Sequence, residues 1–183
     1  MSNTSDTSTI LVVFDLDGTL LNRASQVSSL TAETLIKLRQ HNIAYTIATG
    51  RTLQAASAPL RPHCFPLPLI LKNGAIIWSP AEQRYSKQHL LNTEEIAKAL
   101  TIFEFSDLTP FIFSLNSMQE HALYHGVLKS NSEHRLAELF EEERDLPLQE
   151  IDRMPSEVGV INLFSVGNAV AVNRAKKYID SEA

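Results

Sequence analysis

Apolar residues in the first eighty positions form short unbroken runs, which are typical of strands inside a parallel sheet. Ile10–Phe14 is the first run and is rich in β-branched residues, so we expect this strand to be buried on both faces. Ile43–Ala48 and Leu69–Leu71 are the next two runs. Between the first two, Thr31 is a suitable N-cap for a helix that continues to about Gln40. Strand, helix and strand in this order predict a βαβ unit with a right-handed crossover.

Prolines delimit the other elements of this first part. A second helix is predicted from about Thr52 to just before Pro59, because proline removes a backbone donor inside a helix. Three prolines within residues 62–68 disfavour regular structure there. Ile76–Trp78 begins another strand, and the pattern changes after Ser79-Pro80, where we place a domain boundary.

The second half alternates helical patterns with strands of antiparallel character, which predicts an α+β arrangement after the parallel α/β part. The predicted elements are a helix capped by Thr93 and ending near Phe103, strands Pro110–Leu115 and His121–Tyr124, an acidic amphipathic helix over residues 132–144, a strand Val158–Val166 and a helix Ala169–Ile179.

The composition argues against several classes of protein. The 183 residues include 16 Lys and Arg against 21 Asp and Glu, and the net charge of −5 leaves no basic excess for binding nucleic acid or an anionic membrane. A single cysteine, Cys64, excludes an intramolecular disulfide and is typical of a reducing compartment. No apolar stretch approaches the roughly 18 residues of a membrane span. Residues 1–9 lack the features of a secretory signal and are expected to form a disordered polar arm. We therefore expect a soluble cytoplasmic protein.

Two carboxylates follow the first predicted strand. Asp15 and Asp17 flank Leu16, and Gly18 then permits a tight turn. Ligands of open α/β sheets bind at the carboxyl ends of the strands, where this pair would lie. The pair could hold Mg²⁺ or divide nucleophilic and proton-transfer roles, whereas a bare Asp-x-Asp is more often only loop and cap chemistry.

The end of the neighbouring strand favours the catalytic interpretation. Thr49 and Gly50 precede a predicted helix start, where a hydroxyl and backbone N–H groups suit an anion. A cation site beside an anion site indicates Mg²⁺ together with phosphate.

Three segments resemble the motifs of one family. Phe14–Leu21 resembles motif I of the haloacid dehalogenase superfamily of phosphohydrolases, and Ile47–Arg51 resembles its motif II in the form used by the Cof-like, type IIB subfamily. Asn73–Ala75 is similar to the Asn-Gly-Ala turn that follows the third core strand of this subfamily. The resemblance implies a Rossmann-like α/β core, with residues 10–79 as its N-terminal part, and an inserted α+β cap domain over residues 80–183.

The same resemblance implies residue roles. Asp15 would be the nucleophile, and Asp17 would protonate the leaving oxygen and then activate water. The Asp15 carboxylate and the Asp17 backbone carbonyl would bind Mg²⁺. Thr49 and the Gly50 amide would hold the phosphate. Arg51 and Asn73, which match family positions at the edge of the site, are further candidates for binding phosphate or substrate.

The chain also departs from the family pattern. Family members continue past the cap into a motif III lysine and a Gly-Asp-x-x-x-Asp motif IV, whereas Gly167-Asn168-Ala169 lacks the acid. Lys72 is a candidate for the missing lysine, but we favour a solvated or structural role for it, since lysine is usually a surface residue. We therefore expect an incomplete cap, a chain that is the N-terminal part of a longer protein, and self-association through an exposed edge of the core.

The predicted function is a Mg²⁺-dependent phosphatase that hydrolyses a small phosphorylated metabolite through an aspartyl-phosphate. Two alternatives remain open at this stage. One is a phosphosugar mutase, which uses similar motifs. The other is a truncated, catalytically impaired fragment, and a Lys followed by Gly-Asp-x-x-x-Asp in the next stretch of the gene would argue against it.

Overall fold

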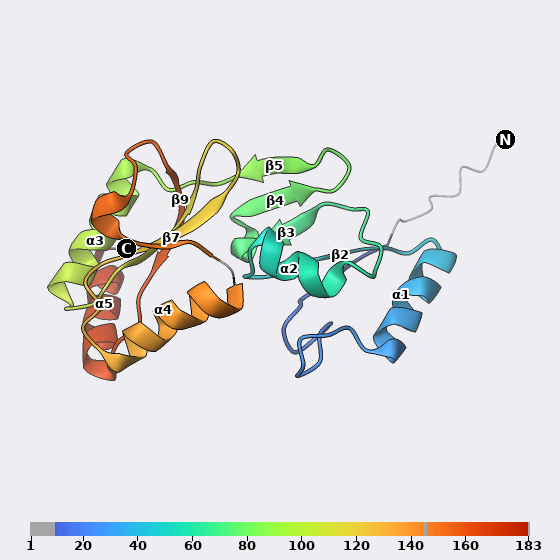
Figure 1. Ribbon diagram of the computed structural model, residues 1–183, viewed down its shortest axis with the longest axis horizontal. Coiled ribbons are helices and arrows are strands. Elements are labelled where there is room, and N and C mark those ends of the chain that lie inside the picture. Colours follow the sequence, from blue (N-terminus) through green and yellow to red (C-terminus); the bar gives the residue numbers. More distant parts are fainter. Residues whose placement is uncertain (1–9, 145, 183) are drawn as a thin grey trace. The chain divides into compact units, whose positions relative to one another are not determined.

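The computed structural model describes residues 10–144 and 146–182, which form two compact units. One unit ends at Gln88 and the other begins at His89 (Figure 1). No helix in the described part of the chain is long and apolar enough to cross a membrane.

A five-stranded arrangement organises the first unit. Strand β1 (Leu11–Phe14) pairs in parallel with β2 (Ala44–Ile47), and helix α1 (Ser29–Gln40) connects them, as the βαβ prediction requires. Beyond β2, strands β3 (Leu69–Leu71), β4 (Ile76–Ser79) and β5 (Arg84–Gln88) form antiparallel hairpins.

One parallel bridge, between Ala48 and Ile70, joins β2 to β3. Strand β5 extends the sheet beyond the elements that the sequence predicted, because Arg84 pairs with Ser79 across the turn after β4.

Side-chain caps fix where the helices begin. Helix α1 starts earlier than predicted, because the Ser28 hydroxyl accepts the Thr31 N–H at 3.1 Å and thereby caps the first turn. Helix α2 (Leu53–Leu60) is capped by Thr52, close to the predicted start. It runs through Pro59, so the prediction that it ends before this proline is wrong. A proline near the last turn removes a single α-helical hydrogen bond, and the helix tolerates this.

Strand β1 is much more exposed than its sequence predicted. Leu11 is 54% exposed and Val13 is 46% exposed, so the expectation of a strand buried on both faces is wrong for the described part of the chain. The cause is its place in the sheet, since β1 lies at the edge and pairs with β2 alone among the described strands. Strand β2 has neighbours on both sides, and its residues 45–47 are buried.

The second unit is a four-stranded sheet with helices. The strands lie in the order β8-β7-β6-β9, and β7 pairs with β8 in parallel while the other pairs are antiparallel. The strand bounds are β6 Phe111–Leu115, β7 His121–His125, β8 Leu148–Glu150 and β9 Gly159–Phe164, and the helix bounds are α3 Thr93–Phe105, α4 Asn131–Arg144 and α5 Ala169–Glu182. Strand β8 was missed by the sequence reasoning because it has only three residues and no alternating pattern.

Two apolar clusters stabilise this unit. Ile112, Tyr124 and Val160 form one buried cluster of the sheet, against which Ile96 and Leu100 of α3 pack. An aromatic cluster joins α4 to the sheet, with centroid distances of 5.3 Å between Phe113 and Phe140 and 5.8 Å between Phe140 and Phe164. Such aromatic contacts contribute beyond the apolar area that they bury.

A buried carboxylate stabilises the start of α4. Oε2 of Glu133 accepts the backbone N–H groups of Lys129 at 2.6 Å and Ser130 at 2.8 Å. The side chain is only 4% exposed. Burial opposes the ionisation of Glu133, but the hydrogen bonds from Lys129, Thr109 and Ser130 together outweigh it, so the pKa of this carboxyl is lowered.

We predict that Glu133→Gln destabilises the protein in a pH-dependent way. A carboxyl with a lowered folded-state pKa stabilises the fold above its unfolded pKa, and this contribution is lost as the pH falls through the folded pKa. The variant should therefore lose about 1 to 3 kcal/mol at pH 7, the usual value of hydrogen bonds to a charged group, and much less in acid. Thermal unfolding at pH 7 and pH 3 measures this difference. Glu138→Gln, at an exposed position of the same helix, is the matched control, and an equal loss in both variants would contradict the prediction.

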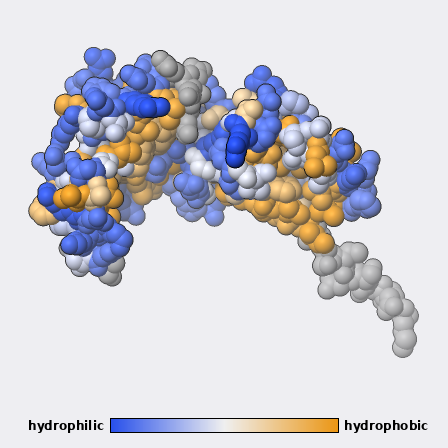
Figure 2. Space-filling view, turned by 90° about the horizontal axis from the view of Figure 1, so that it is seen from below, coloured by the Kyte–Doolittle hydropathy of each residue, from blue (hydrophilic) through white to orange (hydrophobic). Residues whose placement is uncertain are grey.

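We also predict that the chain self-associates through β1. Figure 2 shows hydrophobic surface on the first unit, and Leu11 and Val13 of the edge strand and Ile10 just before it are each at least 46% exposed. An apolar edge strand offers unpaired backbone groups to a second copy. Light scattering should show a mass that rises with concentration, and Val13→Lys should reduce it. Met118→Lys adds the same charge at a position in the second unit that is 74% exposed, and it should leave the mass unchanged. A concentration-independent monomer would refute this mode of association.

Candidate active site

The loop after β1 presents two carboxylates by burying the residue between them. Leu16 is fully buried, while Asp15 and Asp17 on either side of it are exposed. The Leu20 N–H donates to the Asp15 carbonyl at 3.2 Å, which closes the loop, and Gly18 takes a left-handed conformation with φ 76°. This conformation is the one for which glycine is favoured, so the Gly18 of the sequence prediction forms the expected turn.

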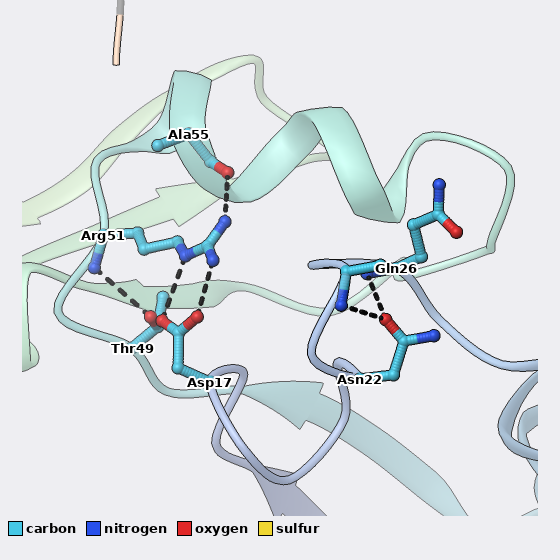
Figure 3. Close-up of polar contacts among 7 residues, drawn as sticks. Asp17, Asn22, Gln26, Thr49, Arg51 and Ala55 are labelled. Atoms are coloured by element: carbon cyan, nitrogen blue, oxygen red, sulfur yellow. Dashed lines mark hydrogen bonds and ion pairs between the residues drawn. The ribbon is translucent and has the colours of Figure 1, made fainter. Parts of the chain in front are cut away.

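A small hairpin follows this loop. Leu21 bridges to Val27, and the Asn22 side chain accepts the N–H groups of Ala24 at 2.9 Å and Gln26 at 3.1 Å (Figure 3). The side-chain bonds of Asn22 fix the tip of the hairpin.

Thr49 organises the loop after β2. It is only 4% exposed, its N–H donates to the Ile70 carbonyl at 3.0 Å, and its own carbonyl accepts the Asn73 N–H at 3.0 Å. Its hydroxyl accepts the Arg51 N–H at 3.2 Å. Thr49 therefore connects the ends of β2 and β3, and it places Arg51 and Asn73 on neighbouring loops.

The turn after β3 has an unusual backbone. Lys72, Asn73 and Gly74 all have positive φ, at 49°, 57° and 93°. The Lys72 N–H donates to the Arg51 carbonyl at 3.2 Å, which fastens this turn to the loop after β2. A side chain at Gly50 would place its Cβ 3.0 Å from Oδ1 of Asn73, so glycine allows the close approach of these two loops.

Lys72 is not a solvated residue. It is 8% exposed, which contradicts the expectation of a solvated lysine. The cause is its position at the end of the buried strand β3, between two loops that contact each other.

Arg51 and Asp17 form the main polar contact of the site (Figure 3). Nε of Arg51 donates to Oδ2 of Asp17 at 3.0 Å, and Nη2 donates to Oδ1 at 2.5 Å. This two-pronged geometry is the strongest form of an arginine–carboxylate contact. The Arg51 side chain is 18% exposed and that of Asp17 is 60% exposed, so the guanidinium is the more enclosed partner.

Helix α2 holds the third guanidinium nitrogen. Nη1 of Arg51 donates to the Ala55 carbonyl at 3.1 Å. An α-helix would supply the N–H of residue 59 to that carbonyl, but residue 59 is a proline and has no N–H. Arg51 therefore occupies an acceptor that Pro59 leaves without its α-helical donor. Sequence reasoning missed the Ala55 carbonyl, although a proline four residues downstream in a helical pattern is a usable signal.

The predicted site residues are thus brought to one edge of the sheet. Contacts join Asp17 to Arg51, Arg51 to Thr49, and Thr49 to Asn73, and Gly50 lies against Asn73. Asp15 is exposed at the start of the same loop as Asp17.

The donor set suits a weakly held, hard cation. Asp15 offers an exposed carboxylate, whereas the carboxylate of Asp17 is engaged by Arg51, which leaves its backbone carbonyl as the oxygen suited to a metal. In the described residues no group of three or more His, Cys, Asp or Glu side chains could hold a metal ion. Mg²⁺ fits such a site, because it is commonly bound by one or two carboxylates together with substrate phosphate and water.

Known proteins resemble this chain both in sequence and in structure. The chain is 27% identical over 95 residues to the 5-amino-6-(5-phospho-D-ribitylamino)uracil phosphatase YitU of Bacillus subtilis (strain 168), an alignment that covers 52% of this chain and 35% of that protein. A haloacid dehalogenase-like hydrolase from B. subtilis has a similar structure, with a TM-score of 0.69 and 18% identity, over 93% of this chain and 66% of the other.

A HAD/COF-like hydrolase from Plasmodium vivax gives a TM-score of 0.68 at 16% identity, over 94% of this chain and 63% of the other. The chain therefore spans less than two thirds of the length of these proteins. Residues 12–183 match the haloacid dehalogenase-like hydrolase family throughout. With its two acids, its Thr49 loop and its Asn73 turn in the order of the motifs, the chain belongs to the haloacid dehalogenase-like hydrolase family.

Proposed function

We propose that the chain carries the phosphoryl-transfer site of a Mg²⁺-dependent phosphatase that acts on small phosphorylated metabolites. The observation that supports this most is the meeting of an acid pair and an anion-binding loop at one sheet edge, through the contact of Asp17 with Arg51. The family match and the phosphatase relative are consistent with it. In this proposal the second unit is the cap domain of the family and selects the substrate.

Asp15 is the nucleophile in the proposed reaction. Its carboxylate oxygen attacks phosphorus, the ester P–O bond breaks, and Asp17 gives a proton to the leaving alcohol oxygen. Water then attacks the aspartyl-phosphate, Asp17 takes the proton of that water, and Asp15 and inorganic phosphate are released. Proton transfer by a positioned side chain is commonly worth about 10²–10⁴-fold in rate.

The loop after β2 holds the phosphate in this proposal. Thr49 contributes a hydroxyl, the exposed Gly50 would contribute its N–H just before the N-terminus of α2, and Arg51 adds a positive charge. Asn73 lies against Gly50 and can donate its side-chain amide. Mg²⁺, held by the Asp15 carboxylate and the Asp17 backbone carbonyl, would neutralise charge that develops on the phosphoryl oxygens.

A second candidate function is phosphate binding with little turnover. The sparse metal-binding set supports it, because the described residues offer no cluster of three potential ligands. Removing one hydrogen-bond donor that stabilises the charge developing in the transition state lowers the rate on the order of 10²–10³-fold. The experiment with Asp15→Asn and the wild-type chain, described next, distinguishes the phosphatase from a protein that only binds phosphate.

We predict that Asp15→Asn abolishes hydrolysis of para-nitrophenyl phosphate by the chain, because an amide cannot replace the nucleophilic carboxylate. Released para-nitrophenol, measured with Mg²⁺ present, reports the rate. Asp152→Asn, at an exposed position in the second unit, is the matched control and should keep the wild-type rate. Turnover by the Asp15 variant would exclude this residue as nucleophile, and a wild-type chain that binds phosphate without turnover would favour the second candidate.

We predict further that Mg²⁺ binds tightly only together with phosphate. The protein ligands proposed here are one carboxylate and one carbonyl, and Mg²⁺ completes such a set with phosphate oxygens and water. Calorimetric titration of the chain with Mg²⁺ should show weak binding, and inorganic phosphate at saturation should tighten it. Micromolar binding of Mg²⁺ without phosphate would show that further protein ligands exist.

A further inference from the structure

We propose that Arg51 exchanges partners when substrate binds, leaving Asp17 for the phosphoryl oxygens, so that the Asp17 carboxylate can turn toward the reacting oxygens. The inference rests on the proposed phosphatase function and adds a control step to it. In this view the contact of Arg51 with Asp17 is the resting state of the site.

The geometry of the contact suits such an exchange. Nε and Nη2 of Arg51 form parallel hydrogen bonds to the two oxygens of Asp17. The same fork binds two oxygens of a phosphate equally well, because carboxylate and phosphate both match the planar guanidinium. A phosphate ester also carries more negative charge than a carboxylate, so it is a strong competitor for Arg51.

The structure indicates which partner moves. Arg51 is held at both ends, by its backbone N–H on the Thr49 hydroxyl at 3.2 Å and by Nη1 on the Ala55 carbonyl at 3.1 Å. Its side chain is 18% exposed. The side chain of Asp17 is 60% exposed and precedes the glycine turn at residue 18. Asp17 can therefore rotate into solvent or toward substrate while the guanidinium stays in place.

Pro59 contributes to the difference in how firmly Arg51 and Asp17 are held. Because residue 59 lacks an N–H, the Ala55 carbonyl is without its α-helical donor and accepts from Arg51 instead. The fork of Nε and Nη2 is consequently presented at the sheet edge in one orientation, whether Asp17 or phosphate accepts from it.

The exchange has a geometric consequence for Asp17. While both of its oxygens accept hydrogen bonds from the guanidinium, the pair with Arg51 fixes the orientation of the carboxylate. Release from Arg51 lets the carboxylate turn toward the reacting oxygens, where it can take up a proton from water and give it to the leaving oxygen. Arg51 therefore acts on the reaction as a positioning residue as well as a phosphate ligand.

A double-mutant cycle tests the exchange, with inorganic phosphate as the probe and calorimetry on the full chain as the readout. Asp17→Asn removes the competitor for Arg51, so it should tighten phosphate binding by about five- to tenfold, the size expected of a partly exposed, two-pronged ion pair. In an Arg51→Gln background the same change at Asp17 should tighten binding no more than twofold. The exchange therefore predicts that the effect of Asp17→Asn on phosphate affinity depends on Arg51.

Asp15→Asn provides the control for charge alone. It removes one negative charge from the same loop but not from the pair with Arg51, so its effect on phosphate affinity should be the same with Arg51 or Gln at position 51. Equal tightening by Asp17→Asn in both backgrounds would reduce the effect to general electrostatics and overturn the exchange.

Failure of the proposed function gives a different result. If neither the wild-type chain nor the Asp17 variant binds phosphate, the phosphate site itself is refuted, and the exchange with it. If phosphate binds but without the dependence on Arg51, the site stands and only the exchange is refuted.

A second readout does not depend on the substitutions. The NMR signal of the Arg51 Nε–H group in the wild-type chain should shift on addition of phosphate, and chloride at the same ionic strength should leave it in place. An Arg51 signal that is unmoved at saturating phosphate would overturn the exchange. Arg51→Lys, which keeps the charge and loses the fork, should abolish most of the coupling to Asp17 in the cycle, and circular dichroism should verify that each variant is folded.

Discussion

The site depends on one buried residue, Thr49, in which the backbone N–H, the carbonyl and the hydroxyl all form hydrogen bonds. The N–H donates to Ile70 and the carbonyl accepts from Asn73, so the ends of β2 and β3 are held together although a single parallel bridge joins the two strands. The hydroxyl accepts the N–H of Arg51. Unpaired polar groups at a buried position would be costly, and this cost maintains the geometry of the loops after β2 and β3.

The two charged loops differ in how firmly they are held. Arg51 lies between Thr49 and the Ala55 carbonyl of α2, whereas Asp17 is on an exposed loop whose fixed point is the buried Leu16. The cationic part of the site is therefore the more enclosed, and the acidic part is the more exposed. That division suits phosphate chemistry, in which the anion must be received in a fixed orientation while proton donors change their state during the reaction.

Local chemistry made much of this fold predictable. Strand β2, the Thr52 cap and the Gly18 turn follow from residue types and short spacings, and the family resemblance of the three loops is confirmed by the match over residues 12–183. Three failures involve partners that lie far away in the sequence. The exposure of β1 depends on how many strands flank it, the burial of Lys72 depends on two loops meeting, and the contact of Asp17 with Arg51 joins residues 34 positions apart. The early start of α1 has a different cause. Ser28 and Thr31 are both suitable N-caps and their hydroxyls contact each other, but the Thr31 N–H donates to the Ser28 hydroxyl, so Ser28 is the cap.

The exposure of β1 also bears on the chemistry, because this strand leads directly into Asp15. Leu11 and Val13 are about half exposed, while Leu16, just past Asp15, is fully buried. Asp15, the proposed nucleophile, is therefore fixed on its C-terminal side by a core residue and on its N-terminal side by an edge strand that is paired on one side alone among the described strands. Whatever pairs with the free edge of β1 would restrict the backbone that carries Asp15. Since misplacing a reacting group by about 1 Å can cost 10²-fold in rate, completing the sheet at β1 would be a catalytic contribution as well as a structural one.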